Sequence, residues 1–493
     1  MQEEEASAPL TTSGFIKKIL ILLAISSLTA WSGRFIGLST QQQLASGVFL
    51  SAILGTLLFW NLRLSIAFIG VSVLVMTHSM TITQYVESAE VPIILFLIGM
   101  MIILGCLEDL GFFTWVVQSI ISLPNMSARR FVAVVSVVSA LLACAVGEVV
   151  SIIIIVTLVF QVCGRLKIKP VPFVIASVIA TNIGSAGTMM GNPVGILIGA
   201  KAGFTFGDFI VWAFPVMAAC LVANILLTFF VYRHSLSGFD AALSERASSG
   251  TTEPQVHVPY KRSLVVLGVS ILCIAFHHQA EQLLGIEKNS VLFLAPVFCA
   301  AFVMLYRRDR ARHYVERSVD WWTLLFFMML FAIAGALKSS GVTTVLAKQF
   351  IAHFGTNLNL LVVGITAVSA VGSAFVDNVV FVAAFAPIIE GLKATGFTVT
   401  PLWWALLFGA CFGGNITLIG STANIVALGM LEKQAHTQIR FMDWLKVGLL
   451  SAVVTCALAG GTIILLKNRM PEIDLSAAHE TPEAPPSAAH SAE

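Results

Sequence analysis

Long apolar runs recur along the chain, and many are long enough to cross a bilayer, since a spanning helix needs about 20 predominantly apolar residues. Hydrophobic residues make up 57% of the 493 residues and charged residues 11%, which is far too apolar for a soluble protein. The runs are continuously apolar and do not alternate, so they predict helices and exclude the strands of a transmembrane barrel. The sequence therefore predicts an all-α polytopic membrane protein.

We expect about eleven transmembrane helices, over residues 15–31, 44–60, 62–79, 91–107, 171–200, 208–232, 262–278, 290–306, 321–337, 402–430 and 443–466. Two further apolar segments, 131–163 and 358–392, are predicted to be hairpins. The first run follows Lys17 and Lys18 and has no small-residue cleavage site after it, so it is expected to be a retained helix.

Two apolar segments are interrupted by small and polar residues. Residues 412–429 read FGGNITLIGSTANIVALG, and residues 181–199 read TNIGSAGTMMGNPVGILIG. A backbone unwound inside a bilayer must face protein or a wet cavity, because lipid cannot satisfy its N–H and C=O groups. Each break also leaves helix ends with partial charges that can attract ions. Both segments are therefore predicted to be broken helices at a binding site.

The chain is predicted to be a duplication. At one constant offset, Gly105 matches Gly335 and Gly111 matches Gly341, and the same offset sets AVGEVVSIIIIVTL, from Ala145, against FVDNVVFVAAFAPI, from Phe375. A shift one residue smaller sets Thr188 against Thr417 in the two broken helices. A constant register across separate polar segments is hard to obtain by chance in apolar sequence.

The second copy is predicted to be inverted in the membrane. Basic residues flank segment 131–163 on both sides, which places both of its ends in the cytoplasm and makes it a re-entrant hairpin with Gly147 and Glu148 at its tip. The repeat makes 358–392 the second hairpin, with Asp377 and Asn378 at its tip. Counting from a cytoplasmic N-terminus puts most of the 28 Lys and Arg residues on the inner side. Opposed hairpins are the plan of secondary transporters.

These boundaries give five parts: an N-terminal segment with the first helix (1–43), inverted repeat 1 (44–232), a cytoplasmic linker (233–261), inverted repeat 2 (262–466) and a disordered tail (467–493). We expect the two tips and the two breaks to meet near the middle of the membrane. The predicted substrate- or ion-binding residues are Glu148, Asn182, Thr188, Asn192, Asp377, Asn378, Asn415, Thr417, Ser421, Thr422 and Asn424.

Other chemistry is not indicated. The eight cysteines lie in or at the end of apolar runs and are expected to be reduced packing residues. His277 and His278 lack further metal ligands nearby in sequence, and no nucleotide-binding or hydrolase motif is found. We expect no enzyme activity, no catalytic residue, no cofactor and no metal beyond a sodium ion at the predicted site. The expected partners are the lipid bilayer and a small ion, with no nucleic acid.

The motifs resemble a known family. GMMIILGCLEDLGFF, TNIGSAGTMMGNPVGILIG, FVDNVVFVAAFAPII and GACFGGNITLIGSTANIVALG, followed by FMDWLKVGL, are similar to the ArsB/NhaD permeases of the ion transporter superfamily, which include the melanosomal P protein. The resemblance implies an elevator-type secondary transporter, a homodimer, in a bacterial inner membrane or a membrane derived from it. Where the family commonly has Asp-Asn and Gly-Asp-Pro-Pro-Asn, this chain has Gly147-Glu148 and Gly-Asn-Pro-Val-Gly from Gly191.

Three functions stay open at this point. The first is a sodium/proton antiporter in which Asp377 and Glu148 exchange a cation for protons, because a buried acid responds to both burial and a bound cation. The second is a proton- or sodium-coupled permease for an anion or oxyacid of the arsenite, silicate or carboxylate type, held by helix N-termini. No buried Arg or Lys is expected near the breaks, which disfavours a multivalent anion. The third is a scaffold or receptor with an inert site.

Overall fold

The computed structural model describes residues 12–123, 126–248, 260–394, 397–435 and 437–471, and every regular element within these ranges is a helix. Among them, eight helices are long and apolar enough to cross a membrane, or nine if the bent pair α14 (Lys261–Ala275) and α15 (His277–Leu284), which meet at 56°, is one span. The all-α polytopic prediction is confirmed, although several predicted spans are shorter or broken helices.

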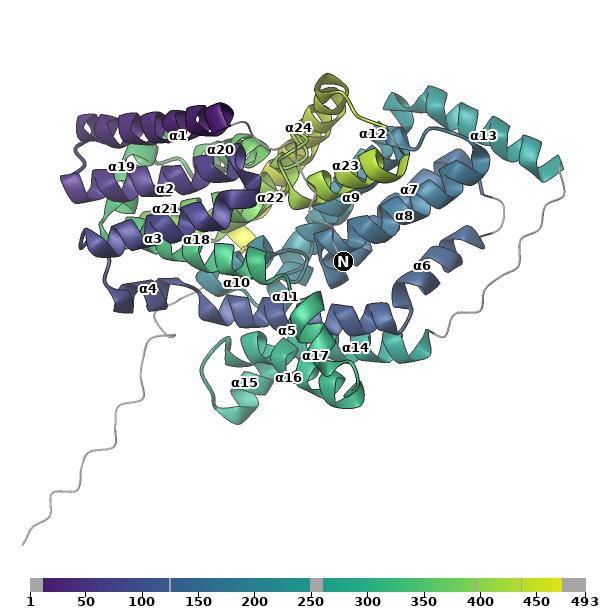
Figure 1. Ribbon diagram of the computed structural model, residues 1–493, viewed down its shortest axis with the longest axis horizontal. Coiled ribbons are helices and arrows are strands. Elements are labelled where there is room, and N and C mark those ends of the chain that lie inside the picture. The colour runs from purple at the N-terminus through teal and green to yellow at the C-terminus, as the bar shows by residue number, and fades with distance from the viewer. Residues whose placement is uncertain (1–11, 124–125, 249–259, 395–396, 436, 472–493) are drawn as a thin grey trace, which may run out of the picture.

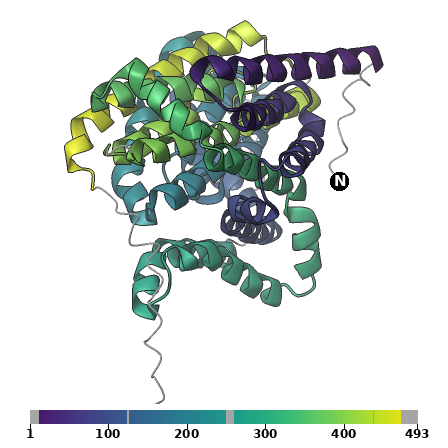
Figure 2. The ribbon, with the colours of Figure 1, turned by 90° about the vertical axis from the view of Figure 1, so that its left-hand side faces the viewer.

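One set of helices, which we call the framework bundle, comes from the first part of each half of the chain (Figures 1 and 2). Within it α5 packs on α16 and α18 packs on α3. Its helices are α1 (Thr12–Ser32), α2 (Thr40–Leu58), α3 (Arg63–Met76), α4 (Ile82–Ser88), α5 (Val91–Asp109), α6 (Phe112–Ile121), α14, α15, α16 (Ser290–Tyr306), α17 (Ala311–His313), α18 (Trp321–Ser339) and α19 (Val342–Phe354).

The second set, the hairpin bundle, comes from the later part of each half. Within it α7 packs on α9 and α20 packs on α22. Its helices are α7 (Ala128–Val146), α8 (Glu148–Leu166), α9 (Val171–Ser185), α10 (Pro193–Ala202), α11 (Phe206–Asp208), α12 (Phe214–Val231), α13 (Arg233–Ser248), α20 (Leu358–Phe375), α21 (Asn378–Ala394), α22 (Thr400–Gly413), α23 (Thr422–Ala435) and α24 (Phe441–Leu466).

The two hairpins lie on opposite sides of the molecule in Figure 1, with α7 and α8 to the right and α20 and α21 to the left. Helices α7 and α8 have 19 residues each, so each is about 28 Å long and reaches as far as a spanning helix. Length alone therefore does not separate a re-entrant hairpin from a pair of spans.

Few helices connect the two bundles. Helix α21 packs on α18 and α19, α8 packs on α6, and α10 packs on α5. Two ion pairs cross this junction: Lys201 at the end of α10 pairs with Glu90 before α5, and Lys338 Nζ lies 2.5 Å from Glu390 Oε2 on α21. Helix α21 makes most of this junction, α19 also packs on α20 and α11 on α14, and elsewhere each bundle packs mainly within itself.

Local sequence explains where the hairpin-bundle helices begin. Proline stands in the first turn of α9, α10 and α22, where its missing N–H costs nothing. Helix α7 begins after Ser127, whose side chain accepts a hydrogen bond from Arg130 N, and Asp240 Oδ1 accepts from Ala128 N at 2.7 Å. These caps fix the start of the first hairpin.

The predicted cytoplasmic linker is partly helical. Helix α13 occupies its first part and packs against α7 and α8, with the Phe239 ring 5.2 Å from that of Phe131. Residues 249–259 and the tail from 472 lie outside the described residues. The linker prediction missed α13 because that segment is polar, with contacts made through a few apolar residues such as Phe239, which is buried.

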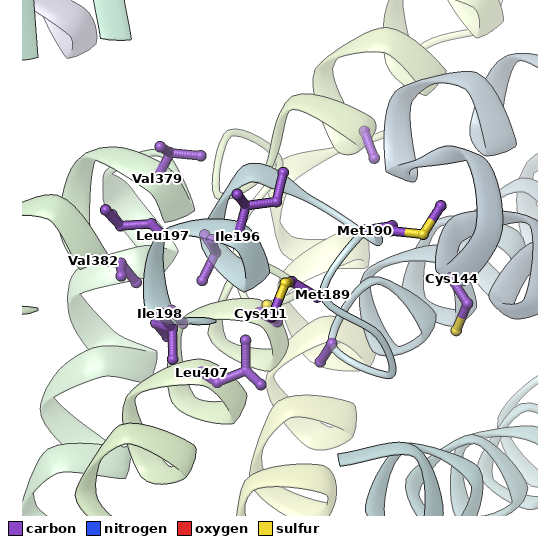
Figure 3. Close-up of a cluster of buried hydrophobic side chains, with 14 of the residues drawn as sticks. Cys144, Met189, Met190, Ile196, Leu197, Ile198, Val379, Val382, Leu407 and Cys411 are labelled. Carbon is purple, nitrogen blue, oxygen red and sulfur yellow. The ribbon is translucent and has the colours of Figure 1, made fainter. Parts of the chain in front are cut away.

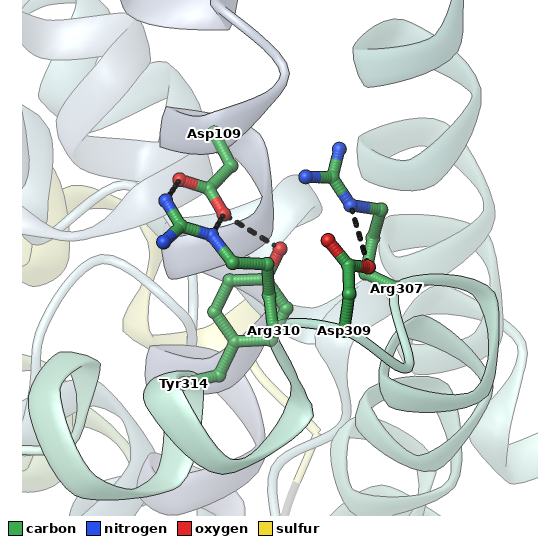
Figure 4. A network of polar contacts seen from close by, with 5 residues as sticks. All are labelled: Asp109, Arg307, Asp309, Arg310 and Tyr314. Carbon is green, nitrogen blue, oxygen red and sulfur yellow. Dashed lines mark hydrogen bonds and ion pairs between the residues drawn. The ribbon is translucent and has the colours of Figure 1, made fainter.

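Within the framework bundle, a polar cluster ties α5 to the segment after α16 (Figure 4). Arg310 donates to both carboxylate oxygens of Asp109, at 3.0 and 3.1 Å, and the buried Tyr314 hydroxyl donates to Asp109 Oδ2 at 2.9 Å. Burial, followed by the bond to Asp109, raises the pKa of the Tyr314 hydroxyl. The cluster fixes one end of α5 through a bidentate arginine pair.

Candidate functional site

The first break lies between α9 and α10. Asn192 caps α10, because its Oδ1 accepts a hydrogen bond from Gly195 N (2.9 Å) and its Nδ2 donates to Ser185 Oγ (2.9 Å). The loop folds back so closely that a Cβ atom on Gly191 would collide with Ser185 O. The break is a compact polar loop closed by its own side chains, and glycine is required where the backbone meets itself.

The second break lies between α22 and α23. The buried Asn424 side chain donates through Nδ2 to Gly414 O and to Thr417 O, both at 2.8 Å. On its far side, the Trp444 indole of α24 donates to Asn415 O at 3.0 Å. The carbonyls freed by unwinding this helix are therefore satisfied inside the protein, as a non-helical segment in a membrane requires.

Asn182 joins the two breaks. Its Nδ2 donates to Asn415 Oδ1 (2.8 Å) and to Asn424 Oδ1 (2.9 Å), while its Oδ1 accepts from Ser421 Oγ (3.0 Å). These four side chains are buried, with relative exposure between 0% and 1%. Their amides are bonded mainly to one another, so this cluster holds the site together and leaves only part of its polar capacity for a ligand.

The first hairpin turns at Gly147, whose φ of 91° and ψ of 158° suit glycine almost exclusively. The turn rests on the first break, since Glu148 N donates to Gly191 O (3.1 Å) and Thr188 Oγ1 donates to Cys144 O (2.5 Å). The Glu148 side chain is 8% exposed, and its Oε2 has no hydrogen-bond partner among the described residues.

The second hairpin turns at Asp377 and rests on the second break. Asp377 Oδ1 accepts from Val379 N (3.0 Å) and Oδ2 accepts from Thr422 Oγ1 (2.9 Å). With its amide oriented so that both atoms find partners, Asn378 Nδ2 donates to Gly420 O at 2.8 Å. Unlike Glu148, Asp377 therefore has a donor on each carboxylate oxygen.

Equivalent contacts hold each hairpin to its break. Thr188 donates to the Cys144 carbonyl, and at the corresponding positions Thr417 donates to the Ala374 carbonyl. A Cβ atom on Gly184 would collide with the Ala140 backbone, and one on Gly413 would collide with the Ala370 backbone. These matching contacts support the duplicated arrangement expected from the sequence.

The residues predicted as a site all lie at these tips and breaks, and Asn182 joins the two breaks on which the tips rest. Other residues were not predicted. Ser185 and Cys411 both bond to Asn192, and Ser373 donates to Ala410 O at 2.8 Å. The small-residue pattern of α9 and α22 was the available signal for them.

One arginine of the framework bundle is buried. Arg63, the first residue of α3, is 7% exposed. Its Nη2 donates to Thr323 Oγ1 (3.0 Å), and the guanidinium lies over the Phe326 ring, 5.0 Å from its centre. Because Arg63 opens an apolar run, it resembled an interfacial arginine.

Apolar packing surrounds the first break (Figure 3). Helix α10 presents Leu197 and Ile198 between Val379 and Val382 of α21 and Leu407 of α22. Among the described residues, no group of three or more His, Cys, Asp or Glu side chains is placed to hold a metal ion. His277 and His278 are therefore not part of such a group. All eight cysteines are free thiols. Two carboxylates with hydroxyl and amide oxygens remain as the polar donor set, and oxygen donors suit hard cations.

Comparisons with known proteins identify relatives over most of the chain. An uncharacterized transporter of Mycobacterium tuberculosis is 32% identical over 372 residues, covering 74% of this chain and 84% of the relative. An uncharacterized transporter of Synechocystis is 26% identical and covers 82% and 92%. The P protein of Homo sapiens is 24% identical, over 76% of this chain and 53% of its own length.

A solved structure shares the fold. The YdaH transporter of Alcanivorax borkumensis superposes with a TM-score of 0.50 at 17% identity, over 79% of this chain and 87% of that one. The model of a family described as citrate transporter matches residues 53–409. The resemblance seen in the motifs is thus confirmed at the level of the family, and the chain belongs to the citrate transporter family of integral membrane transporters.

Proposed function

We propose that this transporter is a secondary antiporter that exchanges sodium for protons. The observation that carries this proposal is that two carboxylates, Glu148 and Asp377, stand at the turns of the two hairpins, which rest on breaks joined by Asn182. Placing an ionisable side chain inside the membrane costs free energy, so acids in such a position are usually functional. A cation and a proton can compete for them, which couples the two fluxes.

The supporting architecture is also a proposal. We propose two inverted repeats, 44–232 and 262–466, in which the hairpin bundle moves against the framework bundle as an elevator. Apart from the packing of α21 on α18 and α19, few contacts join the bundles, which supports such a motion. We further propose a homodimer in a bacterial inner membrane, with a cytoplasmic N-terminus.

A second candidate is a coupled permease for a carboxylate. It is favoured by the family description, citrate transporter. The crowding of two acids in the same region disfavours it, because like charges near an anion raise its binding cost.

The test is transport by the purified protein in proteoliposomes that contain a pH-sensitive dye. A sodium pulse should change the internal pH, and Asp377→Asn should abolish that change while the protein remains monodisperse. Asp443→Asn, an exposed aspartate in the first turn of α24, is the matched control and should keep wild-type activity. If sodium leaves the internal pH unchanged while labelled citrate accumulates, the permease is the correct function.

A further inference from the structure

Two charged side chains of the framework bundle lie at the same end of that bundle, where it meets the hairpin bundle. Glu90 is the residue before α5, and Lys338 stands in the last turn of α18. A Cβ atom on Gly335, one turn before Lys338, would collide with the Ser88 side chain. Ser88 is two residues before Glu90, so the framework bundle presents one acid and one lysine close together.

The hairpin bundle presents the opposite charges. Lys201 stands in the last turn of α10 and pairs with Glu90. Glu390 of α21 pairs with Lys338, whose Nζ lies 2.5 Å from Oε2 of the glutamate. Helices α10 and α21 pack on each other, so these two charges belong to one packed unit. We call the four residues Glu90, Lys201, Lys338 and Glu390 the clasp.

The clasp is partly removed from water. The side chains of Glu90 and Glu390 are each 20% exposed and that of Lys201 is 29% exposed, whereas that of Lys338 is 57% exposed. A fully exposed ion pair contributes little free energy, but a buried charge that loses its partner is costly. Separating the bundles would leave two acids and one lysine without their counter-charges in this partly buried place. The clasp therefore opposes separation more than the same pairs on an open surface would.

Both hairpin-bundle charges stand on helices that begin at the candidate site. Helix α10 begins after Asn192 in the first break, and Lys201 lies about 14 Å farther along its axis. Helix α21 begins at Asn378, beside the tip residue Asp377, and Glu390 lies about 18 Å farther along its axis. A shift of the first break or of the second tip would be carried along these helices to the clasp.

We propose that the clasp holds the hairpin bundle against the framework bundle in this conformation, and that it must open each time the hairpin bundle moves. This proposal rests on the elevator movement proposed above. Each bundle contributes one acid and one lysine, so opening the clasp separates two balanced pairs and leaves no net charge on either bundle at this place.

Linking the clasp covalently is the first test. In the full chain with Lys338→Cys and Glu390→Cys, a short bifunctional methanethiosulfonate joins the two bundles, and a reductant releases them. Uptake of labelled sodium or labelled citrate into proteoliposomes, whichever the wild type moves, should be lost on linking and return on reduction. The wild-type chain treated in the same way accounts for the native thiols.

A matched control links two residues within one bundle. Lys467, after α24, donates to Asn359 of α20, and both belong to the hairpin bundle. The chain with Asn359→Cys and Lys467→Cys should therefore keep its uptake when the same reagent joins the pair.

Swapping the charges is the second test, and it separates a clasp from a side chain that only fills space. Lys201→Glu places a second acid against Glu90, which disfavours this conformation and should slow uptake by about fivefold. Glu90→Lys combined with Lys201→Glu restores an ion pair in reverse order and should return uptake to near the wild-type rate. If Lys201→Glu does not fold, Lys201→Gln, which only removes the charge, should slow uptake by a smaller factor.

Hydrogen–deuterium exchange tests the clasp without transport. Amide exchange in α10 and α21 of the purified protein should slow when the clasp is linked and stay unchanged when the control pair is linked, because a held bundle opens less often. If the wild type moves neither sodium nor citrate, the proposed transport is wrong and amide exchange decides on the clasp. The clasp is overturned if the linked protein still transports, if the charge swap restores nothing, or if amide exchange ignores the link.

Discussion

The first and second breaks can be compared position by position. Both rest on their hairpins through a threonine bonded to a carbonyl and through a glycine pressed on a helix backbone. The side chains at corresponding positions differ: Asn182 in α9 corresponds to Cys411 in α22, and Asn192 corresponds to Ser421. The duplicated features hold each hairpin to its break, whereas the features that differ, Asn182 and Asn192, bond the first break to the second half of the chain.

The contacts that both breaks make with their hairpins predict the largest effect on stability. Gly184→Ala and Gly413→Ala each force a methyl group into backbone, and each should destabilise the protein by about 3 kcal/mol, to a similar extent. Thermal unfolding in detergent measures this. Gly164→Ala in α8, where a Cβ atom meets nothing within 4 Å, should cause no loss. Strongly unequal effects of the two core substitutions would mean that the halves are not packed alike.

The side chains that differ between the two breaks predict an intermediate effect on the free energy of unfolding. Asn182→Ala leaves the buried Asn415 and Asn424 oxygens without their donor and should cost about 2 kcal/mol. Cys411→Ala removes a weaker acceptor of Asn192, which keeps its bond to Ser185, and should cost about 1 kcal/mol. Chemical denaturation of both variants tests the difference, and equal losses would show that Asn182 has no special linking role.

The smallest effect concerns the two threonines. Thr188→Val and Thr417→Val keep the side-chain shape but leave one hairpin carbonyl each without its donor, and each should cost about 1 kcal/mol. The control is Thr157→Val, whose exposed hydroxyl bonds only within its own helix and should change little. Melting temperatures that fall for one core threonine and not for the other would break the proposed equivalence.

The sequence was sufficient to predict the features that appear as local exceptions within long apolar runs. Glycine and asparagine inside apolar runs marked both breaks, and the acids Glu148 and Asp377 marked the tips, because each violates the apolar background. Two features could not be predicted. The bonds from Asn182 to the second break and from Arg63 to Thr323 depend on how distant helices pack, and no spacing in the chain encodes these contacts.

The contacts between α5 and α18 and their neighbours cross from one half of the chain to the other. A Cβ atom on Gly105 would collide with Ser318, and one on Gly335 would collide with Ser88, so each half seals a face of the other. During synthesis, the first half must therefore wait in the bilayer with that face uncovered until the second half has been inserted. Two halves made as separate chains should accordingly be recovered only when they are produced together.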